Sequence, residues 1–202
     1  MSQPTPYGCS PSAVTEIPVK PSQQTPQRRL TIEFMYLDLD VCARCRTTAT
    51  HLEEALTEVA GLLDAIGVEV SFTKIQVQSL EQAIALDFFS SPTIRVNGSD
   101  IQLESKESHC VPCSTIGGIA TDCRVWLYQG QEYGAPPTAM LVDALLREVC
   151  DSAGTRPSRP PIPDSAWANL KRFFEAKQKK QVSAGTEAQN GTGKCCATGG
   201  CC

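Results

Sequence analysis

Eleven cysteines stand in this chain of 202 residues, and eight of them occur in pairs. Two pairs have the CxxC spacing and two are adjacent pairs near the C-terminal end: Cys42/Cys45, Cys110/Cys113, Cys195/Cys196 and Cys201/Cys202. Thiolates attack disulfides and bind soft metal ions. Clusters of this kind in a reducing compartment indicate redox or metal chemistry, because stable disulfides are rare there.

The first CxxC pair follows directly on a strand pattern. An apolar run, Leu30–Leu37, is followed by an acidic turn at 38–40, then by Cys42-Ala-Arg-Cys45 and a long helical pattern. The positive end of a helix stabilises a thiolate. We therefore expect Cys42 to be the more exposed and more acidic sulfur and Cys45 to be shielded. Arg44 adds a nearby cation, while the acidic turn acts in the opposite direction.

Two uses of this pair remain open at the level of sequence. In thiol-disulfide exchange, Cys42 attacks a disulfide and Cys45 resolves the mixed disulfide, with no cofactor required. In metal capture, the two thiolates hold a soft ion. The strand-to-helix position favours exchange, which would make the protein a thiol-disulfide oxidoreductase.

The second CxxC pair lies in an insertion, residues 101–122, that we expect to be irregular. Cys110, Cys113 and the nearby Cys123 can act as an auxiliary redox group that exchanges with the first pair. They can also form a zinc site, with His109 as a further ligand. A local disulfide or idle thiols are the remaining alternatives.

The C-terminal pairs give the strongest metal signal in the sequence. Adjacent cysteines do not readily close a disulfide, whose geometry needs its two residues further apart. Cys195, Cys196, Cys201 and Cys202 can instead offer two to four sulfurs to Hg(II), As(III) or Cu(I). A flexible tether would keep them at roughly millimolar effective concentration near the core. A relay of the ion to Cys42 and Cys45 is therefore feasible.

Composition divides the chain into five segments. They are a disordered lead-in (1–29), a domain (30–150), a Pro-rich linker (151–164), a basic amphipathic helix (165–182) and a flexible Cys-rich tail (183–202). Trp167, Leu170, Phe173 and Phe174 form one face of that helix, which we expect to dock on the domain.

Hydrophobic periodicity sets the order of elements within the domain. We expect strands at Leu30–Leu37, Val68–Val77, the residues after Pro92 and Cys123–Tyr133, the last interrupted or ended by a turn near Gln129-Gly130. We expect helices from Cys42 to Ile66, from Ser79 to Phe88 or Phe89, and from Thr138 to Val149. The turn Asn97-Gly98 should end the third strand.

Charge and hydropathy exclude several function classes. The net charge is −4, and residues 30–150 hold 7 Lys and Arg against 17 Asp and Glu. An acidic domain argues against nucleic acid as a partner. No run reaches the roughly 18 apolar residues of a membrane span, and the first 29 residues lack the apolar core of a secretory signal. We therefore expect a cytoplasmic protein with no membrane partner.

The order of elements over Leu30–Val149 resembles that of the thioredoxin superfamily. Three features carry the resemblance: Cys42-Ala-Arg-Cys45 at a strand-to-helix junction, the step Ser91-Pro92-Thr93, and a Gly-containing strand before the last helix. The resemblance implies a three-layer α/β/α fold with a mixed four-stranded sheet. It also implies a cis Pro92 that lies against the CxxC pair as part of the catalytic site. Val41 stands where thioredoxins carry tryptophan, and Ala-Arg replaces Gly-Pro within the motif.

Two further resemblances bear on function. The strand–LDL–CxRC–helix signature resembles an uncharacterised bacterial family. The tail resembles the paired terminal cysteines of arsenic metallochaperones and the Cys-Cys tail of mercuric reductases. Our expectation is thiol-disulfide exchange linked to Hg, As or Cu handling, with a non-enzymatic metallochaperone as the alternative. The implied partner is a thiol/disulfide protein or a metal-delivering protein.

Overall fold

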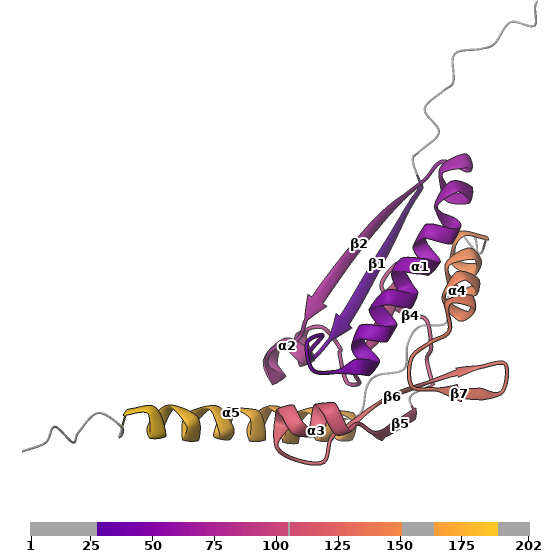
Figure 1. Ribbon diagram of the computed structural model, residues 1–202. Coiled ribbons are helices and arrows are strands. Elements are labelled where there is room, and N and C mark those ends of the chain that lie inside the picture. The colour runs from indigo at the N-terminus through magenta and orange to yellow at the C-terminus, as the bar shows by residue number, and fades with distance from the viewer. Residues whose placement is uncertain (1–27, 105, 151–163, 190–202) are drawn as a thin grey trace, which may run out of the picture.

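The computed structural model describes residues 28–104, 106–150 and 164–189 (Figure 1). In chain order the elements are β1 (Arg28–Tyr36), α1 (Ala43–Ala65), β2 (Val68–Gln76), α2 (Leu80–Ala85), β3 (Thr93–Val96), β4 (Ser99–Asp100), β5 (Lys106–His109), α3 (Val111–Gly117), β6 (Asp122–Tyr128), β7 (Gln131–Tyr133), α4 (Thr138–Cys150), a 3₁₀ turn (Asp164–Trp167) and α5 (Ala168–Gln189). The predicted lead-in up to residue 27, the linker up to residue 163 and the tail from residue 190 lie outside the described residues. Residues 28–29 lie in β1 instead of the expected lead-in, and residues 183–189 continue α5 instead of the expected flexible tail.

The main sheet is mixed and has four strands, in the order β2-β1-β3-β4. Strands β1 and β2 pair in parallel because α1 carries the chain back between them, whereas β3 runs antiparallel to β1 and β4 runs antiparallel to β3. The predicted α/β class with a four-stranded mixed sheet is confirmed.

The fourth strand of this sheet is not the one that the sequence indicated. The residues expected to form it, Cys123–Tyr133, fold as the hairpin β6–β7, which joins β5 in a separate three-stranded antiparallel sheet. The edge beside β3 is taken by β4, because Asn97 and Gly98 adopt left-handed φ angles of 49° and 78° and turn the chain back at once.

The expectation of an irregular insertion at residues 101–122 is also wrong. Strand β5 pairs with β6 through four residues, and Ser108 lies opposite Cys123. Helix α3 then begins after Cys110, with Pro112 in its first turn, where a fixed φ suits a helix start. The second CxxC motif therefore lies on regular structure.

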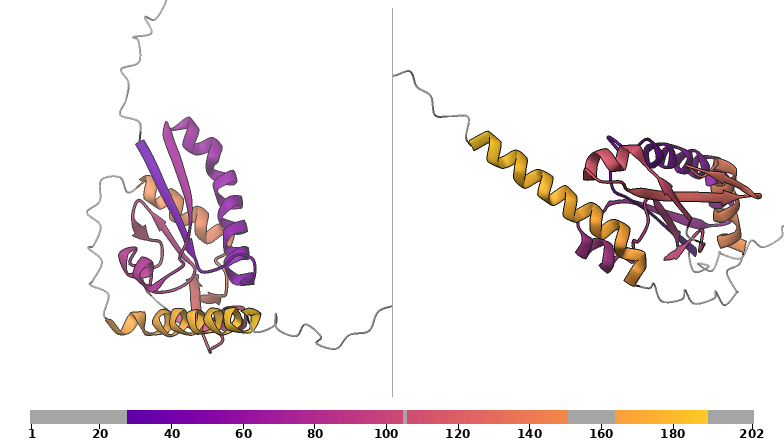
Figure 2. Two further views of the ribbon diagram at one scale, coloured as in Figure 1. Left: turned by 90° about the vertical axis from the view of Figure 1, so that its left-hand side faces the viewer. Right: turned by 90° about the horizontal axis from the view of Figure 1, so that it is seen from below.

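Helices lie against both faces of the main sheet. On one face, α1 and α4 pack on β1 and β3 through a core that includes Ile32, Phe34, Leu52, Ile94 and Leu145. On the other face, α2 and α5 cover the end of β1 at Met35 and Leu37. Figure 2 shows α5 crossing this end of the molecule instead of running along the strands.

Helix α5 docks through the aromatic face that the sequence identified. Leu170, Phe173 and Phe174 are buried. The Asn169 amide receives the backbone N–H of Asp122 at 3.2 Å and donates to its carbonyl at 2.8 Å. Because these bonds fix α5 against β6, the helix stabilises the region around α3. None of the helices in the described part of the chain is long and apolar enough to cross a bilayer.

Helix α3 packs tightly against Phe173 of α5 at Gly117. A Cβ atom there would stand 2.7 Å from Cδ2 of Phe173. Gly117→Ala should therefore lower the free energy of unfolding by about 1–3 kcal/mol through overpacking, measured by urea denaturation. Gly61→Ala is the matched control, because nothing lies within 4 Å of a Cβ at that helical position. It should be neutral or stabilising by up to about 1 kcal/mol, and equal effects of the two changes would contradict the packing account.

Candidate metal and thiol centre

The first CxxC motif begins helix α1, as the sequence predicted. Cys42 is the N-cap residue with extended backbone angles (φ −83°, ψ 103°), and its sulfur accepts the backbone N–H of Cys45 at 3.5 Å. The acidic turn before it, residues 38–40, is held by hydrogen bonds of Asp38 and Arg46. The Asp38 carboxylate accepts the N–H of Val41 at 2.7 Å, and Arg46 donates to the carbonyls of residues 39 and 40. The backbone therefore holds Cys42 at the positive end of a long helix.

The second CxxC motif has the same local arrangement on the other sheet. Cys110 is the N-cap residue of α3, also with extended backbone angles (φ −122°, ψ 100°), and Cys113 lies in the first turn. Cys123, on the neighbouring strand β6, completes this group. Although each motif is local in sequence, the fold brings the two motifs face to face.

The sulfur atoms of the two motifs meet in one buried cluster. Sγ of Cys42 lies 3.5 Å from Sγ of Cys113 and 4.0 Å from that of Cys110, while Cys113 and Cys123 are 3.2 Å apart. The Sγ atoms of Cys42, Cys110 and Cys113 all lie within 4.8 Å of one another. Among the described residues, this is the one group of three or more His, Cys, Asp and Glu side chains close enough to hold a metal ion.

The expectation that Cys42 is the exposed member of its pair is wrong. Cys42 and Cys45 are both fully buried, and so are the three other cysteines of the cluster. Cys42 is enclosed because Cys110 and Cys113 pack on it together with Tyr36 and Leu39. All five cysteines carry free thiols.

The expectation that Cys42 is the more acidic sulfur agrees with its surroundings. Hydrogen bonds from the neighbouring thiols hold the pKa of Cys42 far below its usual range, with Cys110 contributing most, followed by Cys113. Burial acts in the opposite direction and is outweighed. The cluster therefore stabilises one thiolate, on Cys42.

The pKa values of the other cluster thiols are shifted by that thiolate and by one another. The pKa of Cys45 is raised, chiefly by its hydrogen bond with Cys42 and then by burial. The pKa values of Cys113 and Cys123 are also raised, chiefly by hydrogen bonding with Cys110. Cys110 itself has its pKa lowered to about 7, mainly by its hydrogen bond with Cys113.

Cys45 faces a different neighbour from the other sulfurs. Its Sγ lies 3.5 Å from Oγ of Ser91, which also accepts the backbone N–H of Leu37 at 3.3 Å. The Ser91–Pro92 peptide bond is cis, as the resemblance implied. The loop that carries Pro92 therefore contacts the first CxxC motif through Ser91.

A buried ion pair positions Cys123. The next residue on β6, Arg124, forms a bidentate pair with Asp100 of β4, with both N–O distances 2.8 Å and both side chains fully buried. The backbone N–H of Arg124 also donates to the carbonyl of Ser91 at 2.8 Å. These bonds join the two sheets directly beside the sulfur cluster.

Arg44, inside the first motif, fixes the approach to the second. Its guanidinium donates to Oγ of Ser108 at 3.0 Å and to the carbonyl of His109 at 3.1 Å, and it also contacts the Ser108 carbonyl at 3.4 Å. Both residues belong to β5, directly before Cys110. The sequence indicated a cation near the thiolate, whereas the structure shows a link between the two CxxC segments.

Several predicted ligands are not brought to the cluster. His109 points to its neighbour Asp122 at 3.9 Å with more than half of its side chain exposed, and it is absent from the metal-capable group. Cys150 is exposed at the end of α4. The four tail cysteines and the Cys9 thiol lie outside the described residues.

Sequence reasoning missed Ser91, Asp100 and Arg124 as residues that shape the site. A signal existed for Arg124, since a charge within the apolar strand CRVWLY needs a buried partner. Its partner, Asp100, stands 24 residues earlier and has no local signature. The sequence distinguishes Ser91 only as the residue before Pro92.

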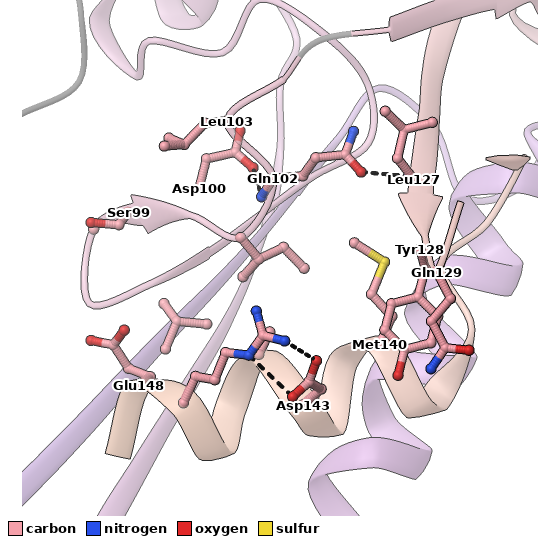
Figure 3. Close-up of a pocket in the computed structure, with 15 residues that line it drawn as sticks. Ser99, Asp100, Gln102, Leu103, Leu127, Tyr128, Gln129, Met140, Asp143 and Glu148 are labelled. Atoms are coloured by element: carbon pink, nitrogen blue, oxygen red, sulfur yellow. Dashed lines mark hydrogen bonds and ion pairs between the residues drawn. The ribbon is translucent and has the colours of Figure 1, made fainter. Parts of the chain in front are cut away.

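A groove of about 620 Å³ opens elsewhere on the molecule, between β4, the end of β6 and α4 (Figure 3). Figure 3 shows Asp143 of α4 in an ion pair and Gln102 bonded to the backbone of Leu127. The partner of Asp143 is Arg147, at 2.6 Å. No cysteine lines this groove. It is therefore separate from the sulfur cluster.

Fold and site together define a mixed α/β domain that encloses a centre of five cysteines. The chain belongs to the DUF2703 family, described as a domain of unknown function, whose model matches residues 30–145. No curated protein and no solved structure matches the chain.

The lowered pKa of Cys42 predicts a pH-dependent signal. Because its pKa lies below the usual range, Cys42 should remain a thiolate as the pH falls to about 6, where an ordinary thiol with a pKa near 8.5 is protonated. The reduced protein should then retain the ultraviolet absorbance of one thiolate. Because Cys42 raises the pKa of Cys110, the test is made in a Cys110→Ser background, where adding Cys42→Ser should remove the absorbance. Cys150→Ser serves as the control, and an unchanged signal after Cys42→Ser in the Cys110→Ser background would contradict the assignment.

The contacts of Arg44 predict a change in the reactivity of Cys110. Arg44→Ala should weaken the attachment of β5 to α1 by about 1 kcal/mol. Buried Cys110 should then be alkylated about fivefold faster. Mass spectrometry of the labelled peptide measures this rate. Arg46 lies on the same helix, but its side chain bonds to the carbonyls of residues 39 and 40. Arg46→Ala should therefore leave the alkylation rate of Cys110 unchanged. Similar acceleration in both variants would count against the specific role of Arg44.

Proposed function

We propose that this domain binds a thiophilic metal or metalloid ion through the thiolates of Cys42, Cys110 and Cys113. One observation carries the proposal: three buried sulfurs from two separate motifs converge within 4.8 Å of one another. Soft thiolate ligands select Cu(I), Zn(II) and related thiophilic ions, and Hg(II) and As(III) belong to the same chemical class.

The geometry of the sulfurs supports this function. Two sulfurs of a tetrahedral zinc site, with Zn–S bonds of about 2.3 Å, stand about 3.8 Å apart. The distances from Cys42, 3.5 and 4.0 Å, bracket that value. Cys42 offers a thiolate for first capture, and the other thiols release protons as they bind. Burial keeps water from competing for the ion.

Thiol-disulfide exchange is the second candidate, and one observation favours it. Cys42 and Cys113 stand 3.5 Å apart across the two motifs, so a disulfide could pass between motifs with little movement. Attack on a protein disulfide, however, needs an accessible thiolate, and Cys42 is fully buried. The enclosed cluster therefore supports ion binding better than exchange with a large partner.

The cysteine tail extends this proposal. Cys195, Cys196, Cys201 and Cys202 would take up the ion from solution or from a metal-delivering partner and pass it to the core, as in the metallochaperones that the tail resembles. The cluster needs free thiols, so a reducing compartment such as the cytoplasm suits it.

The test uses the full-length reduced protein with the four tail cysteines, Cys9 and Cys150 replaced by serine. Under anaerobic conditions, native mass spectrometry should show one bound Zn(II), Hg(II), As(III) or Cu(I) per chain. Cys42→Ser and Cys113→Ser should each weaken binding at least about tenfold, the lower bound for losing even an outer partner of a metal site. Circular dichroism controls for folding. Binding of none of these ions would reject the function, and a disulfide between Cys42 and Cys113 without bound metal would favour exchange.

A further inference from the structure

The cluster contains five sulfurs, and two of them, Cys45 and Cys123, are candidates for a fourth ligand beside the trio of Cys42, Cys110 and Cys113. The identity of the fourth ligand matters, because three thiolates suit a trigonal ion and four suit a tetrahedral one. The CxxC spacing would assign the position to Cys45, the sequence partner of Cys42. The contacts within the cluster point elsewhere.

Cys45 is turned away from most of the trio. Its sulfur lies against the Ser91 hydroxyl at 3.5 Å, and among the cluster sulfurs it interacts with Cys42 alone. It lies in the first turn of α1, so its Cβ position is fixed by the helix.

Cys123 interacts with all three sulfurs of the trio, and its own sulfur is not within 4.8 Å of every one of them. It is 3.2 Å from Cys113 and also interacts with Cys110 and Cys42. The buried pair of Arg124 with Asp100 fixes the strand that carries it. A rotation about its Cα–Cβ bond changes the position of its sulfur without moving the backbone.

We propose that Cys123 is the fourth ligand, so that Cys42, Cys110, Cys113 and Cys123 form a tetrahedral four-thiolate site that takes Zn(II) or Cd(II), while Cys45 remains outside it. This inference rests on the proposed function and specifies its ligand set and ion class. The metal ligands are then one cysteine of the first motif, both cysteines of the second motif and one cysteine of β6. Within the first motif, Cys42 binds the ion and Cys45 contacts Ser91 instead.

The experiment uses Co(II) as the probe in the same full-length background without tail cysteines, Cys9 or Cys150. Four thiolates should give the intense visible bands of tetrahedral Co(II), together with sulfur-to-cobalt charge-transfer bands. Cys123→Ser should lower the charge-transfer intensity by about one quarter, because four Co–S bonds become three. It should also weaken Co(II) binding at least about tenfold. Cys45→Ser is the matched variant and should keep both the spectrum and the affinity.

X-ray absorption spectroscopy of the Zn(II)-loaded protein with all five core cysteines intact counts sulfur ligands without any substitution at the site. A count of four sulfurs, together with weaker Co(II) binding by the Cys123→Ser variant, supports the inference. A count of three sulfurs, with Co(II) binding unchanged by Cys123→Ser, overturns the inference and leaves the three-thiolate function intact. A count of four sulfurs, with Co(II) binding weakened by Cys45→Ser instead, also overturns it. Failure to bind Co(II), Zn(II), Hg(II), As(III) and Cu(I) alike rejects this inference and the proposed function together.

Discussion

The fully buried ion pair between Arg124 and Asp100 is the constraint on which the sulfur centre depends. It joins the antiparallel sheet to the edge strand of the main sheet, with both side chains excluded from solvent. A charge left alone in such a place is strongly unfavourable, by about 3–5 kcal/mol when one partner is removed. The two sheets are therefore held in one arrangement. Cys123 precedes Arg124 in the chain, so the pair also fixes one wall of the cluster.

A second set of contacts brings the two CxxC motifs together. Arg44 projects from α1 and binds the backbone of β5 just before Cys110. Ser91 accepts a backbone bond from β6 and contacts Cys45. The cluster is thus enclosed by links between α1, β5, β6 and the loop before β3. Of the residues that form these links, Arg44 and Cys45 belong to a CxxC motif, and the others lie elsewhere in the chain.

Enclosure changes what the cysteines can do. A helix N-terminus lowers the pKa of a cysteine and, where the sulfur is accessible, makes it a nucleophile. Here the insertion folds over that position, and the thiolate of Cys42 is stabilised by other thiols instead of by water. The same chemistry that activates a nucleophile then gives a buried group of sulfurs that could hold a metal ion. Burial favours a small ion over a protein substrate, because only the small ion can enter without unfolding the cover.

The sequence alone determined the local chemistry and most elements of this protein. The periodicity of residues 30–77, the helix start at Cys42 and the apolar face of α5 are local patterns that depend on neighbouring residues. The tertiary structure decided which cysteines meet, because sulfurs 68 and 71 residues apart are joined only by the packing of two sheets. It also decided that β6 leaves the main sheet, since the turn at Asn97 and Gly98 places β4 on that edge first. Periodicity describes which side of an element is buried, and it contains no information about the element that covers it.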